Sequence, residues 1–117
     1  MNAGEWSRKI LLQRTSNFTM LVRIVKTYRD VVVVCDTDLL GKKFEEGNFQ
    51  LDIKESFYKG KETDESEVIE ILQDMVREDA TFNIVGKEST NAAIKSGIIS
   101  EDNIQTIQNI PFAIKLL

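Results

Sequence analysis

The chain has 117 residues, of which 42% are hydrophobic and 29% charged, with one cysteine and no histidine. This length and composition predict one globular domain. The missing histidine excludes Ser-His and Cys-His catalysis and nearly every zinc site built by proteins. The longest apolar run, residues 31–35, is far shorter than the about 20 residues that cross a membrane, so no membrane partner is expected. Cys35 ends that run, which predicts a buried thiol in a reducing, cytoplasmic compartment.

The charges are segregated along the chain. The formal net charge is −4, but residues 1–61 hold 11 Lys and Arg against 8 Asp and Glu, whereas residues 62–117 hold 4 against 11. The overall sign argues against a generic nucleic-acid binder, and no DNA partner is expected. The segregation nevertheless leaves room for a localised basic face, although such charge runs most often form ordinary solvated surface.

The first part of the chain predicts an extension followed by three strands. Residues 1–19 lack the apolar stretch of an export signal and are expected to be a flexible extension to a domain formed by residues 20–117. Strands are predicted at 21–28, 31–35 and 49–54, and the unbroken β-branched run of the second predicts a central position in a sheet. Between the last two, Asp36 or Asp38 could cap a short helix carrying Leu39, Leu40 and Phe44.

The second part predicts two helices and three more strands. Helix 64–78 begins at a capping-box pattern formed by Asp64 and Glu67, and its outer face is acidic. A strand at 82–85 leads to a helix at 87–96, which Gly97 ends as a left-handed cap. Strands at 104–107 and 112–116 flank a turn at 109–111. The expected fold is α+β, a small mixed sheet of five to six strands with two or three covering helices.

Asp36 and Asp38 suggest one enzymatic function. A buried strand that ends in two carboxylates two residues apart is typical of haloacid-dehalogenase-like phosphatases, in which a magnesium ion lies between nucleophile and acid. The chain is too short for that fold, and its late acidic pair, Glu101 and Asp102, lies in a predicted loop. The simpler interpretation, that one of the two aspartates caps the following helix, is favoured.

The segment Gly86-Lys87-Glu88-Ser89-Thr90 follows a strand and begins a helix. It is not a nucleotide-binding loop, because the required earlier glycine is missing and Lys87 precedes a glutamate. The free amides of a helix start beside Lys87 would still suit one phosphate group. The alternative is an ordinary helix start.

A third candidate site is the segment 55–61, with two aromatic residues, Phe57 and Tyr58, among lysines. A ring can stack on an unpaired base and lysines neutralise phosphates, so the pattern favours RNA. The lysines proposed to contact phosphates are Lys42, Lys43, Lys54, Lys59 and Lys61, and Tyr58 is the proposed stacking group. In the alternative interpretation Phe57 belongs to the core, Tyr58 packs beside it and the lysines are merely exposed.

Residues 20–117 also resemble the archaeal domain of unknown function 424 family. The resemblance is carried by Cys35-Asp36, Leu40-Gly41-Lys42, Glu46-Gly47, Phe57-Tyr58-Lys59-Gly60, Asn83-Ile84-Val85-Gly86 with Ala93 and Gly97, and the ending Ile110-Pro111-Phe112-Ala113. It implies a tie to RNA and the translation apparatus. It supplies no catalytic residues, and no cofactor is expected.

These observations lead to a working interpretation and two alternatives. The first is a non-catalytic RNA-binding or ribosome-associated protein that uses the lysines named above, with Lys87 as a further phosphate contact. The second is a magnesium-dependent phosphoryl-transfer enzyme that uses Asp36 and Asp38. The third is a protein-binding module that acts through the acidic helix 64–78.

Overall fold

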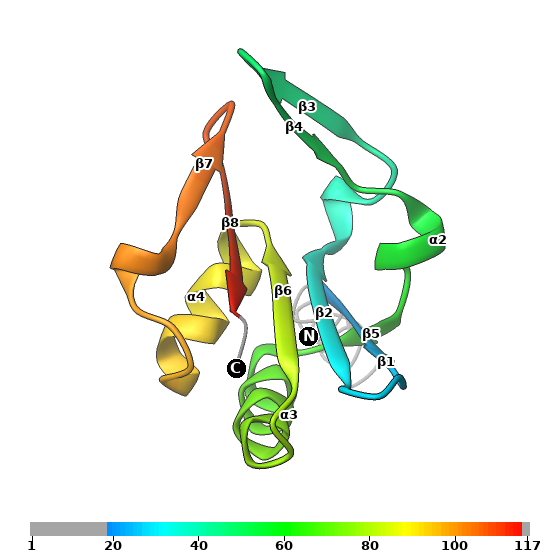
Figure 1. Ribbon diagram of the computed structural model, residues 1–117, viewed down its shortest axis with the longest axis vertical. Helices are drawn as coiled ribbons and strands as arrows, with labels where there is room; N and C mark the ends of the chain where they lie inside the picture. The colour runs from blue at the N-terminus through cyan, green and yellow to red at the C-terminus, as the bar shows by residue number, and fades with distance from the viewer. Residues whose placement is uncertain (1–18, 116–117) are drawn as a thin grey trace, which may run out of the picture.

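The computed structural model describes residues 19–115, which form a six-stranded mixed sheet, a separate two-stranded hairpin and short covering helices (Figure 1). The strands are β1 (Met20–Val25), β2 (Val31–Asp36), β3 (Lys43–Glu46), β4 (Phe49–Asp52), β5 (Lys61–Thr63), β6 (Thr81–Val85), β7 (Gln105–Ile107) and β8 (Ile110–Lys115). The helices are α2 (Glu55–Tyr58), α3 (Glu65–Arg77) and α4 (Lys87–Ser96), with 3-10 turns η1 (Thr37–Leu39) and η2 (Glu101–Asn103). The α+β class predicted from the sequence is confirmed.

The main sheet has the strand order β5-β1-β2-β6-β8-β7. β2 pairs with β1 in the antiparallel sense and with β6 in the parallel sense, so it occupies the interior of the sheet as its valine run predicts. Val32, Val33 and Val34 have no exposed surface. An interior strand buried on both faces can carry such an unbroken apolar run, whereas a strand with one wet face alternates.

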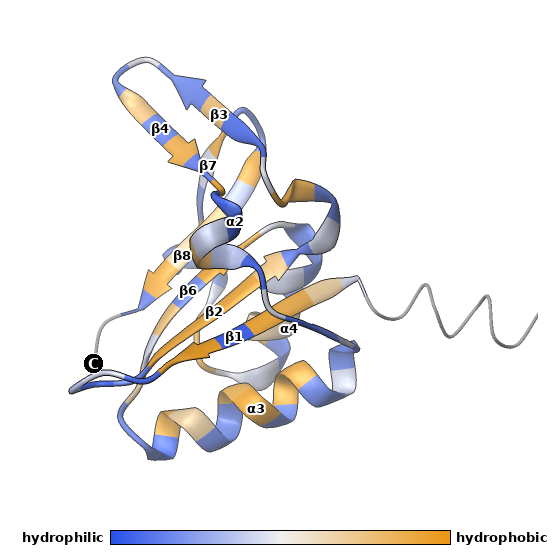
Figure 2. Ribbon diagram, turned by 90° about the vertical axis from the view of Figure 1, so that its right-hand side faces the viewer, coloured by the Kyte–Doolittle hydropathy of each residue, from blue (hydrophilic) through white to orange (hydrophobic). Residues whose placement is uncertain are grey.

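Each face of β2 contributes to a different core, because successive side chains of a strand point to opposite sides. Val32 and Val34 pack on the side of α3 and α4, which lie together beneath the sheet in Figure 2. Val33 and Cys35 pack on the other side, which we call the second face, against apolar residues of η1, β4 and α2. The β3–β4 hairpin projects beyond the sheet from this side (Figures 1 and 2).

The predicted start of α3 and the predicted end of α4 are confirmed. The Asp64 carboxylate accepts the backbone N–H of Glu67 at 2.9 Å, one of the amides that a helix start leaves without a partner. α3 then buries Val68 and Leu72 against the sheet. Gly97 ends α4 in the left-handed conformation, with φ of 86°.

Three local predictions are wrong. The first strand ends at Val25, and residues 26–30 form a turn. The helix expected to carry Phe44 is only the single turn η1, because Ile53 donates its N–H to the Lys42 carbonyl at 2.9 Å and so draws the chain into the β3–β4 hairpin. The last hairpin turns at Gln108 and Asn109, which both have positive φ, rather than at 109–111. In each case pairing between strands, which local sequence does not report, sets the boundary.

The predicted extension lies outside the described residues except for Thr19. The Thr19 carbonyl accepts the N–H of Thr37 at 2.8 Å and its hydroxyl at 3.1 Å, so this residue belongs to the domain. Removing residues 1–18 should therefore leave the thermal midpoint nearly unchanged, as the sequence predicts. Removing Thr19 as well should cost about 1 kcal/mol, or about 4–8 °C for a domain of this size. Calorimetry of the two truncated proteins distinguishes these outcomes, and loss of cooperative unfolding in the first would place the extension in the core.

Candidate functional site

A cleft of about 490 Å³ opens where β2 and β6 end. These two strands are parallel neighbours, and the chain leaves them in opposite directions, toward β5 on one side and toward β7 and β8 on the other. In open sheets such a point, at the carboxyl ends of the strands, is where ligands commonly bind. The lining residues are Thr19, Asp36, Thr37, Asp38, Leu39, Gly86, Lys87, Glu88, Ile110 and Pro111. Both predicted candidates at 36–38 and 86–90 therefore meet at one place.

Asp36 lies at the base of this cleft and caps α4. Its Oδ1 accepts the N–H of Ser89 at 2.8 Å and the hydroxyl of Ser89 at 2.7 Å, and its Oδ2 accepts the N–H of Glu88 at 3.1 Å. The residue at the N-cap position of α4 is Gly86, which has no side chain with which to accept these donors. Burial raises the pKa of the Asp36 carboxyl, and the three hydrogen bonds oppose that rise.

The predicted cap was therefore assigned to the wrong helix. Asp36 occupies the N-cap position of η1 but makes no side-chain hydrogen bond there. The carboxylate serves instead a helix that begins more than fifty positions later in the chain. The prediction that an aspartate here caps a helix was correct. The capped helix is α4, however, and not the short helix that follows Asp36 in the sequence.

The geometry does not favour the phosphoryl-transfer alternative. A nucleophilic carboxylate must present an oxygen to phosphorus, but both oxygens of Asp36 are already held by the start of α4. Asp38 is exposed at the rim. Within residues 19–115 no cluster of three or more His, Cys, Asp and Glu is arranged to hold a metal ion.

Cys35 precedes this aspartate and is fully buried. Burial, together with the negative charges of Asp36 and Asp38, raises the pKa of its thiol to about 12. Because the thiolate is the reactive form, a thiol reagent at pH 8 should label Cys35 in full only after the protein is denatured. Labelling with a chromogenic disulfide reagent, with and without denaturant, tests this; stoichiometric reaction of the native protein within the mixing time would contradict it.

Five of the predicted lysines lie on β3, α2, β5 and the residues beside them, and we call this set the lysine surface. These elements follow one another down the right-hand side of Figure 1. The backbone N–H of Ile53 donates a hydrogen bond to the carbonyl of Lys42, which brings the backbone of Lys54 near that of Lys42. Lys54 and Lys59 are the N-cap and C-cap residues of α2. All five side chains are exposed: Lys42, Lys43, Lys54, Lys59 and Lys61.

The lysines of this surface differ in their partners. Lys43 pairs with Glu45, Lys54 with Asp52 and Lys61 with Glu67, at nitrogen–oxygen distances of 3.5, 3.8 and 3.9 Å. Such exposed pairs are worth at most about 1 kcal/mol, so their lysines can exchange a carboxylate for another anion. Within residues 19–115, no ion pair or side-chain hydrogen bond engages Lys42 or Lys59.

Lys87 does not join this surface. It is exposed, stands at the first position of α4 and lines the cleft. The Asp36 carboxylate already accepts the amides of Glu88 and Ser89 that were expected to suit a phosphate. A phosphate at this helix start would have to displace that carboxylate, so Lys87 remains an isolated cation beside an occupied anion site.

Tyr58 is buried, with 7% of its surface exposed, and its ring meets Phe57 edge-on at a centroid distance of 5.1 Å. Its hydroxyl bonds to the Asn83 side chain, and burial raises its pKa. The expectation that Tyr58 offers a free ring to a base is therefore wrong in this conformation. The one-turn helix α2, which the sequence did not predict, turns Tyr58 inward and leaves Phe57 at 36% exposure.

The apolar wall of the cleft, formed by Leu39, Ile110 and Pro111, was not predicted as part of any site. It brings together segments that are some seventy positions apart in the chain, because β8 pairs with β6 beside β2. The aspartates at and just after the end of β2 and the segment that begins at Gly86 were the signals in the sequence that pointed to this place.

Comparison with known proteins identifies the family but no activity. The model of a family described as proteins of unknown function, DUF424, matches residues 25–116, and this chain belongs to that family. A crystal structure of an uncharacterized conserved protein from Methanopyrus kandleri is similar, with 26% sequence identity and a TM-score of 0.75 over 81% of this chain and 88% of that one. No curated protein matches. Among the described helices, none has the length and apolar character to cross a membrane.

Proposed function

We propose that this protein is a non-catalytic RNA-binding protein that works on the ribosome or elsewhere in the translation apparatus. The observation that carries the proposal is the lysine surface, in which five exposed cations lie on or beside three elements, β3, α2 and β5. A protein with a net charge of −4 can bind a polyanion only through such a local concentration of positive charge. The tie to translation that the resemblance of residues 20–117 implies points the same way.

The mixed charge of this surface shapes how it would bind. Three of its lysines form ion pairs with carboxylates. These negative charges weaken the attraction of the surface for polyanions in general. Lys42 and Lys59 then carry most of the attraction, and the paired lysines contribute only where a phosphate replaces their carboxylate. The expected result is modest, salt-dependent affinity.

The proposal is tested by the salt dependence of binding to single-stranded RNA. Each phosphate contact contributes a log-log slope of magnitude about 0.7, so a variant with Lys42→Gln and Lys59→Gln should lose up to about 1.4 of the parental slope. A matched variant with Lys43→Gln and Lys61→Gln should lose less, because those charges are already partly neutralised. Titration at several salt concentrations measures both slopes.

Replacing all five lysines provides the decisive control. If that variant is folded and still joins RNA, or still sediments with ribosomes from a native lysate, with parental affinity and salt response, the lysine surface is eliminated. Association would then have to run through protein contacts, for which the exposed carboxylates of α3, Glu67, Glu70 and Asp74, are the alternative.

A further inference from the structure

The turn between β1 and β2 carries a fully exposed aromatic ring. Tyr28 has a relative exposure of 108%, against 7% for Tyr58 and 36% for Phe57. A single exposed aromatic residue is ordinary on a protein surface and does not by itself define a site. The residues around Tyr28 distinguish it from an ordinary exposed aromatic residue.

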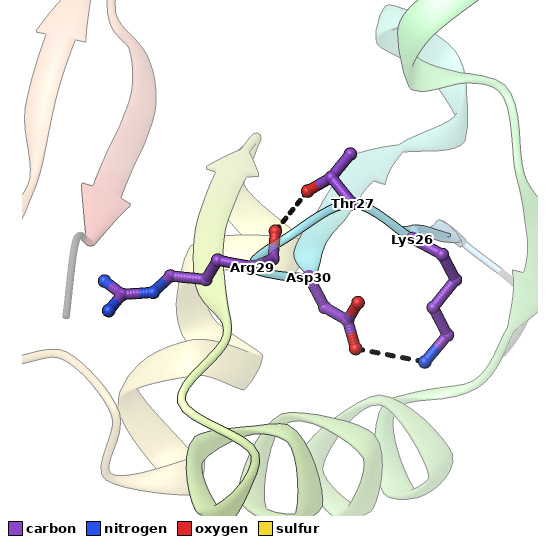
Figure 3. Close-up of polar contacts among 4 residues, drawn as sticks. All are labelled: Lys26, Thr27, Arg29 and Asp30. Atoms are coloured by element: carbon purple, nitrogen blue, oxygen red, sulfur yellow. Dashed lines mark hydrogen bonds and ion pairs between the residues drawn. The ribbon is translucent and has the colours of Figure 1, made fainter.

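The turn that presents Tyr28 is braced on both sides of that residue (Figure 3). The Lys26 ammonium pairs with the Asp30 carboxylate at 3.0 Å, and the Thr27 hydroxyl donates to the carbonyl of Arg29. The Asp30 carbonyl accepts the N–H of Thr81 at 2.9 Å, which ties the turn to β6. A ring held on a braced turn loses less conformational freedom when it binds a partner than a ring on a loose loop.

Beside this turn, no element among residues 19–115 lies over part of the second face of the sheet (Figure 1). The hairpin and α2 lie at the top and right of Figure 1, while the lower parts of β2 and β6 stay in view. The strand register places Val25, Val31 and Thr81 in one row of this face, and each is only partly buried. On β8, Ile114 lies opposite Asn83 and is 61% exposed. Apolar and polar groups thus share this open part of the second face. We call the four residues Val25, Val31, Thr81 and Ile114 the platform.

The charge of β1 and of the turn that follows it is positive. β1 and its turn carry Arg23, Lys26 and Arg29 against the single carboxylate of Asp30. In Figure 3 the Arg29 side chain leaves the turn on the side away from the Lys26–Asp30 pair. The Arg23 guanidinium donates to the Ser56 carbonyl in α2, which joins this group of cations to the lysine surface.

We infer that this platform binds single-stranded RNA, with one unpaired base stacked on Tyr28 and the phosphates running along Arg23 and the lysine surface. Only an unpaired base offers its face to an aromatic ring, which selects a single strand over a duplex. The cations supply the complementary charge. This inference rests on the proposed function and names the part of the surface that recognises the bases.

The test uses the full chain and a labelled oligoadenylate of about ten nucleotides, a length within the usual range for single-strand binding folds. Tyr28→Ala should weaken binding about 5- to 150-fold, the usual effect of losing one stacked base, and leave the salt slope nearly unchanged. Tyr28→Phe keeps the ring and should bind like the parent. Phe49→Ala is the matched control, because Phe49 is also exposed, at 72%, but lies on β4 opposite a carboxylate, that of Glu46. It should have no effect.

The outcomes separate this inference from the proposed function. Because Tyr28 makes no core contact, its variants should keep the parental thermal midpoint, so loss of binding reports recognition. Parental affinity of Tyr28→Ala, or equal binding of a duplex, overturns the stacking inference, and the proposed function still stands if the five-lysine variant loses binding. A parent that binds neither the oligonucleotide nor ribosomes overturns both.

Discussion

Replacing Gly86 with alanine should lower the free energy of unfolding by about 3 kcal/mol or more. Gly86 has φ of 108° and ψ of 161°, a region that only glycine adopts readily. A Cβ at this position would stand 2.2 Å from Cγ of Asp36. The carboxylate could move away only by giving up its bonds to Glu88 and Ser89. Backbone strain and loss of the helix cap therefore add together.

Gly97→Ala is the matched control for the backbone term. This glycine also has positive φ, 86°, but a Cβ there would meet no atom within 4 Å. Its replacement should cost only about 1 kcal/mol. Denaturant unfolding measures both values. Equal losses at the two positions would mean that the approach of Asp36 to Gly86 contributes nothing.

A double variant isolates the steric term. Asp36→Ala removes the carboxylate that a Cβ at position 86 would strike, so Gly86→Ala should cost less in that background than in the parent. Residues in contact are expected to show such non-additivity. An additive result would assign the whole loss to the backbone of residue 86.

The sequence predicted the parts of this fold whose signals are local. The apolar spacing of α3, its Asp64 cap and the glycine that ends α4 each depend on residues within a few positions, and all three are confirmed. The valine run of β2 predicted an interior strand because burial on both faces permits only apolar side chains.

What the sequence could not predict depends on contacts between distant segments. Phe44 pairs with Leu51 in the hairpin, whereas the local sequence predicted that Phe44 belongs to a short helix. Tyr58 and Phe57 are adjacent, chemically similar rings, and only the one turn of α2 decides which of them is buried. The cleft likewise exists because β8 and η1 flank the same pair of parallel strands. The position of the cleft could therefore not be predicted from any single segment of the sequence.

The second large effect is expected for Asp36→Asn, which should destabilise the domain by about 1–3 kcal/mol. Asparagine is in general as good a residue at helix starts as aspartate. In the structure both carboxylate oxygens accept hydrogen bonds, and asparagine has only one oxygen. If that oxygen stays on Ser89, the amide nitrogen faces the N–H of Glu88, and a buried donor is left without an acceptor. Asp38→Asn, at an exposed side chain, is the control and should change little.

The pH dependence of this loss gives a sharper test. Burial raises the pKa of Asp36 above its value in the unfolded chain, so the folded protein holds the proton more tightly. The contribution of this carboxyl to stability is therefore fully present below the unfolded pKa, about 3.9, and is lost as the pH rises through the folded pKa. Asparagine does not titrate, so the difference in unfolding free energy between parent and Asp36→Asn should shrink as the pH is raised from about 4. A difference that grows with pH would show that the amides of α4 outweigh burial and hold Asp36 as a stabilised anion.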